Sequence, residues 1–193
     1  MPDLLIVKLR LCFPAVKGTG WHHDPVMPSD RVLAVLAELE AAGVAAWIDG
    51  GWGIDALLGR QTRPHDDLDL VVAADTIPAC RMIFEAGGFL VERDWLPTAI
   101  AFRHPDGRAV DLHPVEPTAD GGGDQIQLDG VKRWHYPPPV TGSIDGRPVR
   151  CCPVEGQVAA HLGYEPDDQD RADMTELARH FGIELPAPYA ASQ

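Results

Sequence analysis

Long apolar runs, paired cysteines and an excess of basic residues are all missing from this sequence, and each absence narrows what the chain can do. No stretch is long and apolar enough for a transmembrane helix, so we expect no membrane partner. Lysine and arginine number 16 against 29 aspartates and glutamates, a net charge of -13. That balance disfavours a nucleic-acid binder, whose affinity depends on neutralising phosphates, and suits a cationic small substrate or a bound metal.

Cysteine is also scarce, with four residues and no Cys-x-x-Cys spacing. Cys151 and Cys152 are adjacent, which is a poor geometry for a disulfide. We therefore expect free thiols and a cytoplasmic protein.

The length and composition indicate one globular domain with a small appendage. Hydrophobic residues make up 45% of the 193 residues, enough for a core. The organised pattern begins just after Met27, which is a candidate for the natural start. We expect a tail over residues 1–27 that need not be native, a main domain over 28–150 and a helical C-terminal portion over 151–193 packed on it.

The hydrophobic periodicity predicts an α+β fold, in which helices flank a mixed sheet and a small helical portion ends the chain. Ser29 or Asp30 is expected to cap the first helix, and Asp75 a later one. Residues 116–143 are rich in glycine, proline and aspartate, which predicts a loop region with at most one short strand. The predicted helices are 30–42, 52–58, 75–86, 155–161 and 168–181, and the predicted strands are 44–48, 67–72, 98–104 and 108–115.

Three aspartates carry the chemistry that the pattern suggests. Alternation along a strand puts Asp67 and Asp69 on one face, about 7 Å apart, with Leu68 and Leu70 on the other. Asp111 occupies the same kind of position in a second strand, between apolar neighbours. If the two strands are adjacent, the three carboxylates converge, and Mg²⁺ bound by such oxygens suits a phosphoryl displacement.

Residues around these aspartates are candidates for binding a nucleotide. Gly50 and Gly51 have no side chains, so their N–H groups can approach a phosphate, and the helix that starts at Trp52 points its N-terminus at the same place. Arg60 and Arg63 are candidates for neutralising triphosphate charge. A fourth candidate is His65, although a buried structural histidine is the simpler interpretation.

The order of these motifs resembles the DNA polymerase beta nucleotidyltransferase superfamily. More narrowly, the segments Trp47 to Asp55 and His65 to Asp69 resemble the lincosamide nucleotidyltransferases, with a looser similarity to aminoglycoside adenylyltransferases. The similarity continues through Trp95-Leu96-Pro97, residues 110–114 and residues 161–164, and covers about residues 30–180. Many superfamily members have serine after the glycine pair, whereas this chain has Trp52.

The resemblance implies an ATP-type donor, Mg²⁺ and an antibiotic hydroxyl as acceptor. It implies that Asp67 and Asp69 bind metal and that Asp111, the third carboxylate, also takes the acceptor proton. The expected acceptor pocket draws on Trp95, His113, Glu116, His161 and Tyr164. For Glu116, with Asp120 and Asp124, a solvated loop is the competing interpretation, and for Tyr164 it is packing between the last two helices.

The function predicted from these features is Mg²⁺-dependent transfer of a nucleoside monophosphate from a nucleoside triphosphate to a small-molecule hydroxyl, by a monomer or homodimer. Two other functions remain open. One is a nucleotide-binding, antitoxin-like protein without turnover, and the other is nucleotidylation of a protein or RNA. An intact set of three carboxylates argues against the first, and the acidic composition argues against an RNA acceptor.

Overall fold

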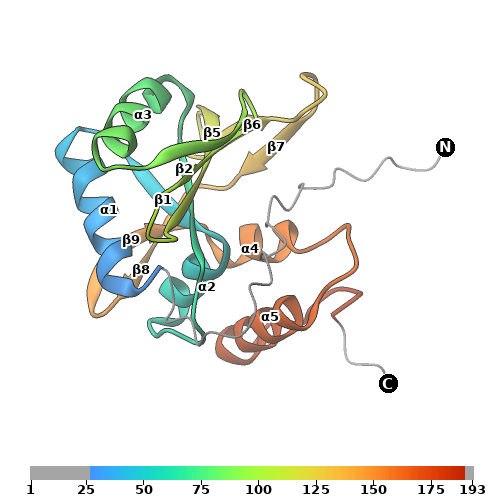
Figure 1. Ribbon diagram of the computed structural model, residues 1–193. Coiled ribbons are helices and arrows are strands. Elements are labelled where there is room, and N and C mark those ends of the chain that lie inside the picture. The colour runs from blue at the N-terminus through green and yellow to red at the C-terminus, as the bar shows by residue number, and fades with distance from the viewer. Residues whose placement is uncertain (1–26, 190–193) are drawn as a thin grey trace.

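The computed structural model describes residues 27–189 and contains one mixed sheet with helices packed on it (Figure 1). A short 3₁₀ turn, η1, spans Ala74–Thr76. The helices are α1 Ser29–Ala41, α2 Gly50–Leu58, α3 Ile77–Ala86, α4 Val154–Ala160 and α5 Asp168–Phe181. The strands are β1 Ala46–Asp49, β2 Asp67–Ala73, β3 Leu90–Trp95, β4 Ala99–Arg103, β5 Ala109–Pro117, β6 Gly123–Ile126, β7 Arg133–Tyr136, β8 Val140–Ile144 and β9 Arg147–Cys151. The predicted α+β class is confirmed.

The strand order is β3-β4-β5-β2-β1-β9-β8, with β6 attached to β5 and β7 to β6. Strand β2 lies in the middle, antiparallel to β1 and parallel to β5. Helices α1 and α3 cover one face of the sheet (Figure 1). The opposite face carries a smaller apolar cluster that includes Trp47, Val71, Val115 and Tyr136.

Alternation along β2 and β5 separates a core face from a polar face, as predicted. Leu68, Leu70, Val110 and Leu112 are fully buried in the main core under α1 and α3. Their neighbours in sequence therefore project from the other face, where the aspartates lie.

Helix α2 joins the sheet to the C-terminal helices. Its Trp52 and Ala56 pack into the main core, while Ile54 and Leu58 pack against Met174 and Leu177 of α5. The left-handed conformation of Gly59 ends the helix at the predicted residue. Helix α5 starts with a capping box formed by Asp167 and Asp170.

Several predicted boundaries are corrected by the structure. Pro28, without a side-chain hydrogen bond, occupies the cap position expected for Ser29 or Asp30. Asp75 lies within the 3₁₀ turn rather than capping α3, whose cap position is Thr76. Helix α2 begins at Gly50, two residues before Trp52.

Two strand predictions were also incomplete. Residues 116–143 contain β6, β7 and the start of β8 instead of a loop with one short strand. Strand β3 was not predicted at all, because it is an edge strand whose mostly exposed, charged residues lack a simple alternation.

Two expectations concern the cysteines and membrane spans. Cys80 and Cys151 are free and buried, as expected, Cys152 is buried, and Cys12 lies outside the described residues. Nowhere in residues 27–189 is there a helix long and apolar enough to cross a membrane.

Met27 is fully buried at the start of the described residues. Its carbonyl accepts a hydrogen bond from Trp52 Nε1 at 3.0 Å, and its backbone N–H donates to the carbonyl of His65 at 3.1 Å. The expected tail before it lies outside the described residues, so the tail's lack of a structural role stays a prediction.

Removal of residues 1–26 is expected to leave the melting temperature and activity close to those of the full chain. A new ammonium group at Met27 can still donate the bond to His65, and the Met27 side chain stays in the core. Removal of Met27 as well should cost about 2–4 kcal/mol, because a buried methionine leaves a cavity. Thermal unfolding of both shortened proteins measures the difference, and equal melting temperatures would contradict the role of Met27.

Candidate active site

Three aspartates lie side by side across the middle of the sheet. In the strand register, Asp69 of β2 is opposite Asp111 of β5 on one side and opposite Asp49 of β1 on the other. Asp67 is one pleat away, opposite Ala109. Cross-strand neighbours share a face, so the predicted convergence of the Asp69 and Asp111 strands is confirmed.

Asp111 is held in an electrostatically unfavourable environment. Burial, together with the charges of Asp69 and Asp67, raises its pKa to about 8, while the charge of Arg93 acts in the opposite direction. Its residue is 3% exposed, and among the described residues its Oδ1 atom has no hydrogen-bond partner. A buried carboxylate oxygen without a hydrogen-bond partner is stabilised when it is protonated or when it binds a cation.

His113 positions Asp69. Its Nε2 atom lies 3.0 Å from Asp69 Oδ1, and its Nδ1 atom lies 3.3 Å from the amide nitrogen of Gln125. That amide nitrogen also donates to the carbonyl of Thr98 at 2.8 Å. Gln125 contacts one ring nitrogen while the other contacts Asp69, so the imidazole orients the Asp69 carboxylate. The predicted contact between His113 and the acceptor remains a prediction.

Gly50 and Gly51 allow the start of α2 to lie against the strand that carries Asp69. A Cβ atom at Gly50, whose φ is +61°, would lie 2.2 Å from Asp69 Oδ2. A Cβ atom at Gly51 would lie 2.5 Å from Arg63 Nη2 and 2.6 Å from His65 Nδ1. Close packing thus explains the glycine pair even before any phosphate is considered.

His65 is the centre of a buried polar network beneath the start of α2. Its Nε2 atom lies 2.5 Å from Asp55 Oδ2, and its Nδ1 atom lies 3.0 Å from Arg63 Nη1. Asp55 also accepts two hydrogen bonds from Thr62, and the indole of Trp52 stacks on the imidazole at 4.7 Å. Both ring nitrogens are engaged, which favours the structural interpretation of His65. Nucleotide contact by His65, or by the backbone N–H of Trp52, stays a prediction.

Both predicted arginines make salt bridges with α5. Arg63 donates to both carboxylate oxygens of Asp173, at 3.1 and 2.8 Å, and Arg60 is paired with Glu176. Arg60 is about half exposed, whereas Arg63 is mostly buried. The pairs tie the C-terminal helix to the loop before β2, and triphosphate binding by either arginine stays a prediction.

Replacement of Asp55 by alanine is expected to destabilise the fold by about 3 kcal/mol, because it leaves His65 and Thr62 without their buried acceptor. Urea unfolding measures the loss. Asp75→Ala, at an exposed aspartate of the 3₁₀ turn, is the matched control and should change stability by less than about 0.5 kcal/mol. Equal stability of the two variants would show that the network is not structural.

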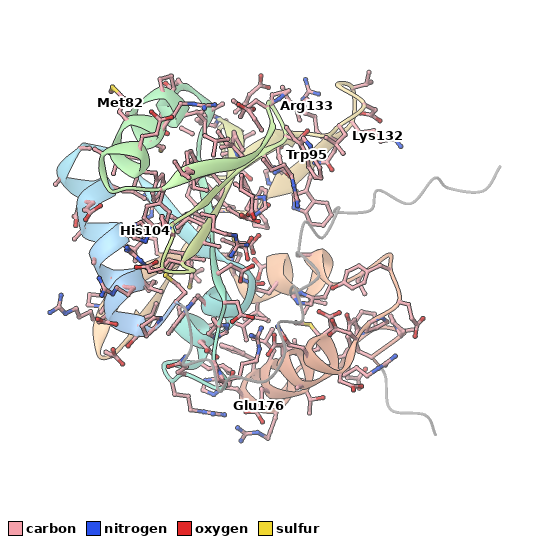
Figure 2. All side chains as sticks on the ribbon, viewed as in Figure 1. Met82, Trp95, His104, Lys132, Arg133 and Glu176 are labelled. Carbon is pink, nitrogen blue, oxygen red and sulfur yellow. The ribbon has the colours of Figure 1, made fainter. Side chains whose placement is uncertain are left out.

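The remaining candidates for the acceptor side lie apart from one another. Trp95 ends β3 and is 37% exposed, and Figure 2 shows its side chain projecting toward the side where α4 lies, away from α1 and α3. Glu116 is exposed and 4.0 Å from Arg133, while Asp120 and Asp124 both contact His135. Glu116 and Asp124 lie on the paired strands β5 and β6, whereas Asp120 lies in the exposed turn between them, so an acceptor contact by Glu116 stays a prediction.

His161 and Tyr164 do not share a helical face, because α4 ends at Ala160. His161 Nδ1 donates to the carbonyl of Gln157 at 2.7 Å, and its Nε2 lies 3.8 Å from Asp170. Tyr164 is half-buried in the turn that follows, next to Gly163 with its positive φ. The helix predicted over 155–161 thus ends close to the expected residue, and an acceptor contact by His161 or Tyr164 stays a prediction.

Asp49 and Tyr136 are residues of this site that the sequence reasoning missed. Asp49 is 1% exposed and shares the face of Asp69 and Asp111. Burial raises the pKa of Tyr136 well above its usual value, and the charge of Asp49 adds to the increase. Alternation from the core residue Ile48 would have placed Asp49 on this face, whereas the approach of Tyr136 depends on tertiary structure.

The donor set suits a hard divalent cation, as the unpartnered oxygen of Asp111 and its raised pKa indicate. In the part of the chain that the structure describes, no three histidine, cysteine, aspartate or glutamate side chains form a ready-made metal cluster. Asp67, Asp69 and Asp111 are the residues that would hold such an ion.

Comparison with known proteins finds relatives that match most of the chain. A model of the aminoglycoside-2''-adenylyltransferase family matches residues 31–177. A lincosamide resistance protein of Staphylococcus haemolyticus is 29% identical over 76% of this chain and 92% of its own length. A 2''-aminoglycoside nucleotidyltransferase of Escherichia coli is 34% identical over 67% of this chain and 70% of its own length.

A solved structure of an antibiotic-modifying enzyme is also similar to this chain. The crystal structure of the lincosamide antibiotic adenylyltransferase LnuA with bound lincomycin superposes with a TM-score of 0.70 at 27% identity. The superposition covers 78% of this chain and 96% of that one. The resemblance inferred from the sequence motifs is confirmed.

Proposed function

Because this chain belongs to the aminoglycoside-2''-adenylyltransferase family and is a nucleotidyltransferase, we propose that it transfers the nucleoside monophosphate of ATP, or of another nucleoside triphosphate, to a hydroxyl of a lincosamide- or aminoglycoside-type antibiotic. The observation that carries the proposal is the register of Asp69 with Asp111 on the polar face of the sheet. Two carboxylates fixed side by side on adjacent strands are the arrangement that a phosphoryl displacement needs.

In the proposed reaction, the acceptor oxygen forms a bond to the α-phosphorus while the bond from that phosphorus to the pyrophosphate oxygen breaks. Pyrophosphate leaves with the bonding electrons, and Asp111 accepts the hydroxyl proton. Asp111 suits this role because it is buried beside Asp69, which makes its carboxylate more basic than an exposed one. Most of the catalysis is positioning and charge stabilisation.

Mg²⁺ bound by Asp67, Asp69 and Asp111 would neutralise the charge of the triphosphate and of the departing pyrophosphate. The protein contributes orientation around these ligands. His113 holds Asp69, and the backbone of Gly50 packs against the same carboxylate. Both contacts limit the rotation of Asp69.

The start of α2 is the proposed site for the triphosphate. Helix α2 spans nine residues, and its N-terminal N–H groups lie beside Asp69, because Gly50 directly follows β1. The helix N-terminus favours an anion there. The donor therefore occupies the β1 side of the row, which leaves the β5 and β4 side for the acceptor.

A pyrophosphate-release assay tests the proposal, with ATP, GTP, CTP and UTP each combined with lincomycin and with an aminoglycoside such as tobramycin. We expect release that depends on Mg²⁺, and a product whose mass increases by one nucleoside monophosphate. Nucleotide binding without release with any acceptor would contradict the proposal and favour a binding protein. Transfer of label to protein or RNA alone would contradict the small-molecule acceptor.

A further inference from the structure

Arg63 lies against the first turn of α2, at the end of the helix where the triphosphate is proposed to bind. A Cβ atom at Gly51, the second residue of α2, would lie 2.5 Å from Arg63 Nη2 and 2.6 Å from His65 Nδ1. The guanidinium and the imidazole are therefore packed directly against the backbone of Gly51. The position of this turn, and of its N–H groups, depends on where these two side chains are held.

The guanidinium of Arg63 has an acceptor at each of its three nitrogen atoms. Nε and Nη2 donate to the two carboxylate oxygens of Asp173, at 3.1 and 2.8 Å. The amide of Gln169, with its oxygen turned to the guanidinium, accepts from Nη2 at 2.7 Å and from Nη1 at 3.0 Å. Nη1 also donates to the carbonyl of Pro64 at 3.2 Å and to His65 at 3.0 Å. A phosphate oxygen would have to displace one of these acceptors, which favours a positioning role for Arg63 over direct contact with the triphosphate.

A chain of hydrogen bonds connects α5 to α2 through Arg63. Because a guanidinium only donates, His65 Nδ1 accepts from Arg63, and the hydrogen of this imidazole is on Nε2. His65 Nε2 then donates to Asp55 Oδ2 at 2.5 Å, and the ring of Trp52 packs on the imidazole with the ring centres 4.7 Å apart. Asp173 is the end of the chain on α5, and Asp55 is its end on α2.

The chain lies between the two elements of the proposed donor site. Residues 59–66 connect α2 to β2, and β2 begins at Asp67. Arg63 belongs to this connection, whereas Asp173 lies on α5, which packs against α2 (Figure 1). Asp173 is 5% exposed and Arg63 is mostly buried, so salt and water screen their ion pair only weakly. An ion pair fixed in this way can hold the start of α2 at a constant distance from the aspartates of β2.

We propose that Asp173 is a positioning residue for the donor nucleotide: by holding Arg63 against Gly51, it keeps the start of α2 in the arrangement that binds the triphosphate. The inference rests on donor binding in the proposed function and deepens it, because it makes the C-terminal helix part of the donor site. Arg63 then supports the backbone N–H groups that bind the triphosphate.

The chain contains a second salt bridge that serves as a matched comparison. Arg60 and Glu176 join the same connection, residues 59–66, to the same helix α5. Arg60 is about half exposed and Glu176 is about one third exposed, so this pair is more accessible to water than Arg63 with Asp173. Loss of the Glu176 charge therefore removes an attachment of α5 while the contacts of Arg63 with Gly51 remain.

The test measures the dissociation constant of ATP by isothermal titration, with Mg²⁺ and without acceptor, in the wild type, Asp173→Asn and Glu176→Gln. The temperature is chosen below the thermal transition of all three proteins. Asparagine keeps the shape of Asp173 but replaces one of its two acceptor oxygens with a donor. We expect Asp173→Asn to weaken ATP binding by about tenfold, the size typical of residues that orient a binding group from behind. Glu176→Gln should stay within about twofold of the wild type.

Two further measurements show whether Asp173 acts through Arg63. With an acceptor that gives turnover, Asp173→Asn should raise KM for ATP, while kcat at saturating ATP and KM for the acceptor change little. In the Arg63→Gln background, Asp173→Asn should add no further loss of ATP binding, because the two residues act as one unit. A residue that only stabilised the fold would lower the melting temperature without changing this dissociation constant.

The outcomes separate this inference from the proposed function. An unchanged dissociation constant in Asp173→Asn, with normal turnover in the wild type, would overturn the positioning role and leave the proposed function standing. Tighter ATP binding in Asp173→Asn would also overturn it, because the released Arg63 would then bind the triphosphate itself. An equal loss in Glu176→Gln would assign the effect to attachment of α5 in general and overturn the role of Asp173.

The wild type distinguishes the remaining cases. ATP binding without pyrophosphate release for any acceptor would overturn the proposed function, and the comparison of Asp173→Asn with Glu176→Gln would still decide the positioning role. Absence of ATP binding in the wild type would overturn both.

Discussion

Asp69→Asn is expected to lower kcat for nucleotidyl transfer by at least about a thousandfold while leaving the fold intact. Asp69 is the middle residue of the carboxylate row, next to Asp49 and Asp111 and in contact with His113. Asparagine keeps the shape of the side chain and an oxygen for His113, but it removes the charge that would bind the metal. Steady-state pyrophosphate release at saturating Mg²⁺ and ATP measures the effect.

Asp66→Asn is the matched control, because Asp66 is exposed and lies just before the strand. It should keep wild-type turnover, and urea unfolding should give both variants a stability close to that of the wild type. A variant at Asp69 with near-native kcat would show that this carboxylate is not part of the catalytic centre. A large loss of stability would instead show that Asp69 is structural.

Local patterns in the sequence were sufficient to predict which strand residues form the aspartate row at the centre of the site. The alternation of Asp67, Leu68 and Asp69 fixes which side chains face the core, and the pattern around Asp111 does the same for β5. Adjacency of the two strands was a condition in that reasoning, and the parallel pairing of β2 with β5 supplies it. The helix ends at Gly59 and Gly182 followed from glycine in the left-handed conformation.

Those local patterns could not predict contacts between segments that are far apart in the chain. The salt bridge from Arg63 to Asp173 joins residues 110 positions apart, so Arg63 looked free to bind phosphate. A bulge also changes the face of every later residue in a strand, and no residue type marks its position in β3. The place of Arg93 beside the site therefore had no signal in the sequence.

Asp111→Asn is expected to reduce kcat by at least about a hundredfold with little change in donor affinity, because the variant loses the group that accepts the acceptor's proton. The donor contacts proposed for α2 lie on the far side of Asp69 and are unchanged. Initial rates at varied ATP and acceptor separate kcat from KM. An unchanged kcat with weaker ATP binding would contradict the proton-accepting role.

The same substitution is expected to raise stability at high pH when no metal is bound. The pKa of Asp111 is about 8 in the folded protein and near 3.8 when exposed, so between these values the folded chain holds a proton that the unfolded chain has released. The free energy of unfolding of the wild type therefore falls as pH rises through this range. Asparagine cannot ionise, so it is not subject to this loss.

The advantage of Asp111→Asn should grow by on the order of 2–4 kcal/mol between about pH 5 and about pH 8. Urea unfolding in the presence of a chelator measures it at both pH values. Added Mg²⁺ should recover stability at about pH 8 in the wild type more than in the variant, since the ion binds the ionised carboxylate in the folded state. Parallel pH profiles for the two proteins would show that Asp111 is not the strained carboxylate of the row. Opposite effects of one substitution, a loss of turnover and a gain of stability, are what a residue held in an unfavourable environment for catalysis should give.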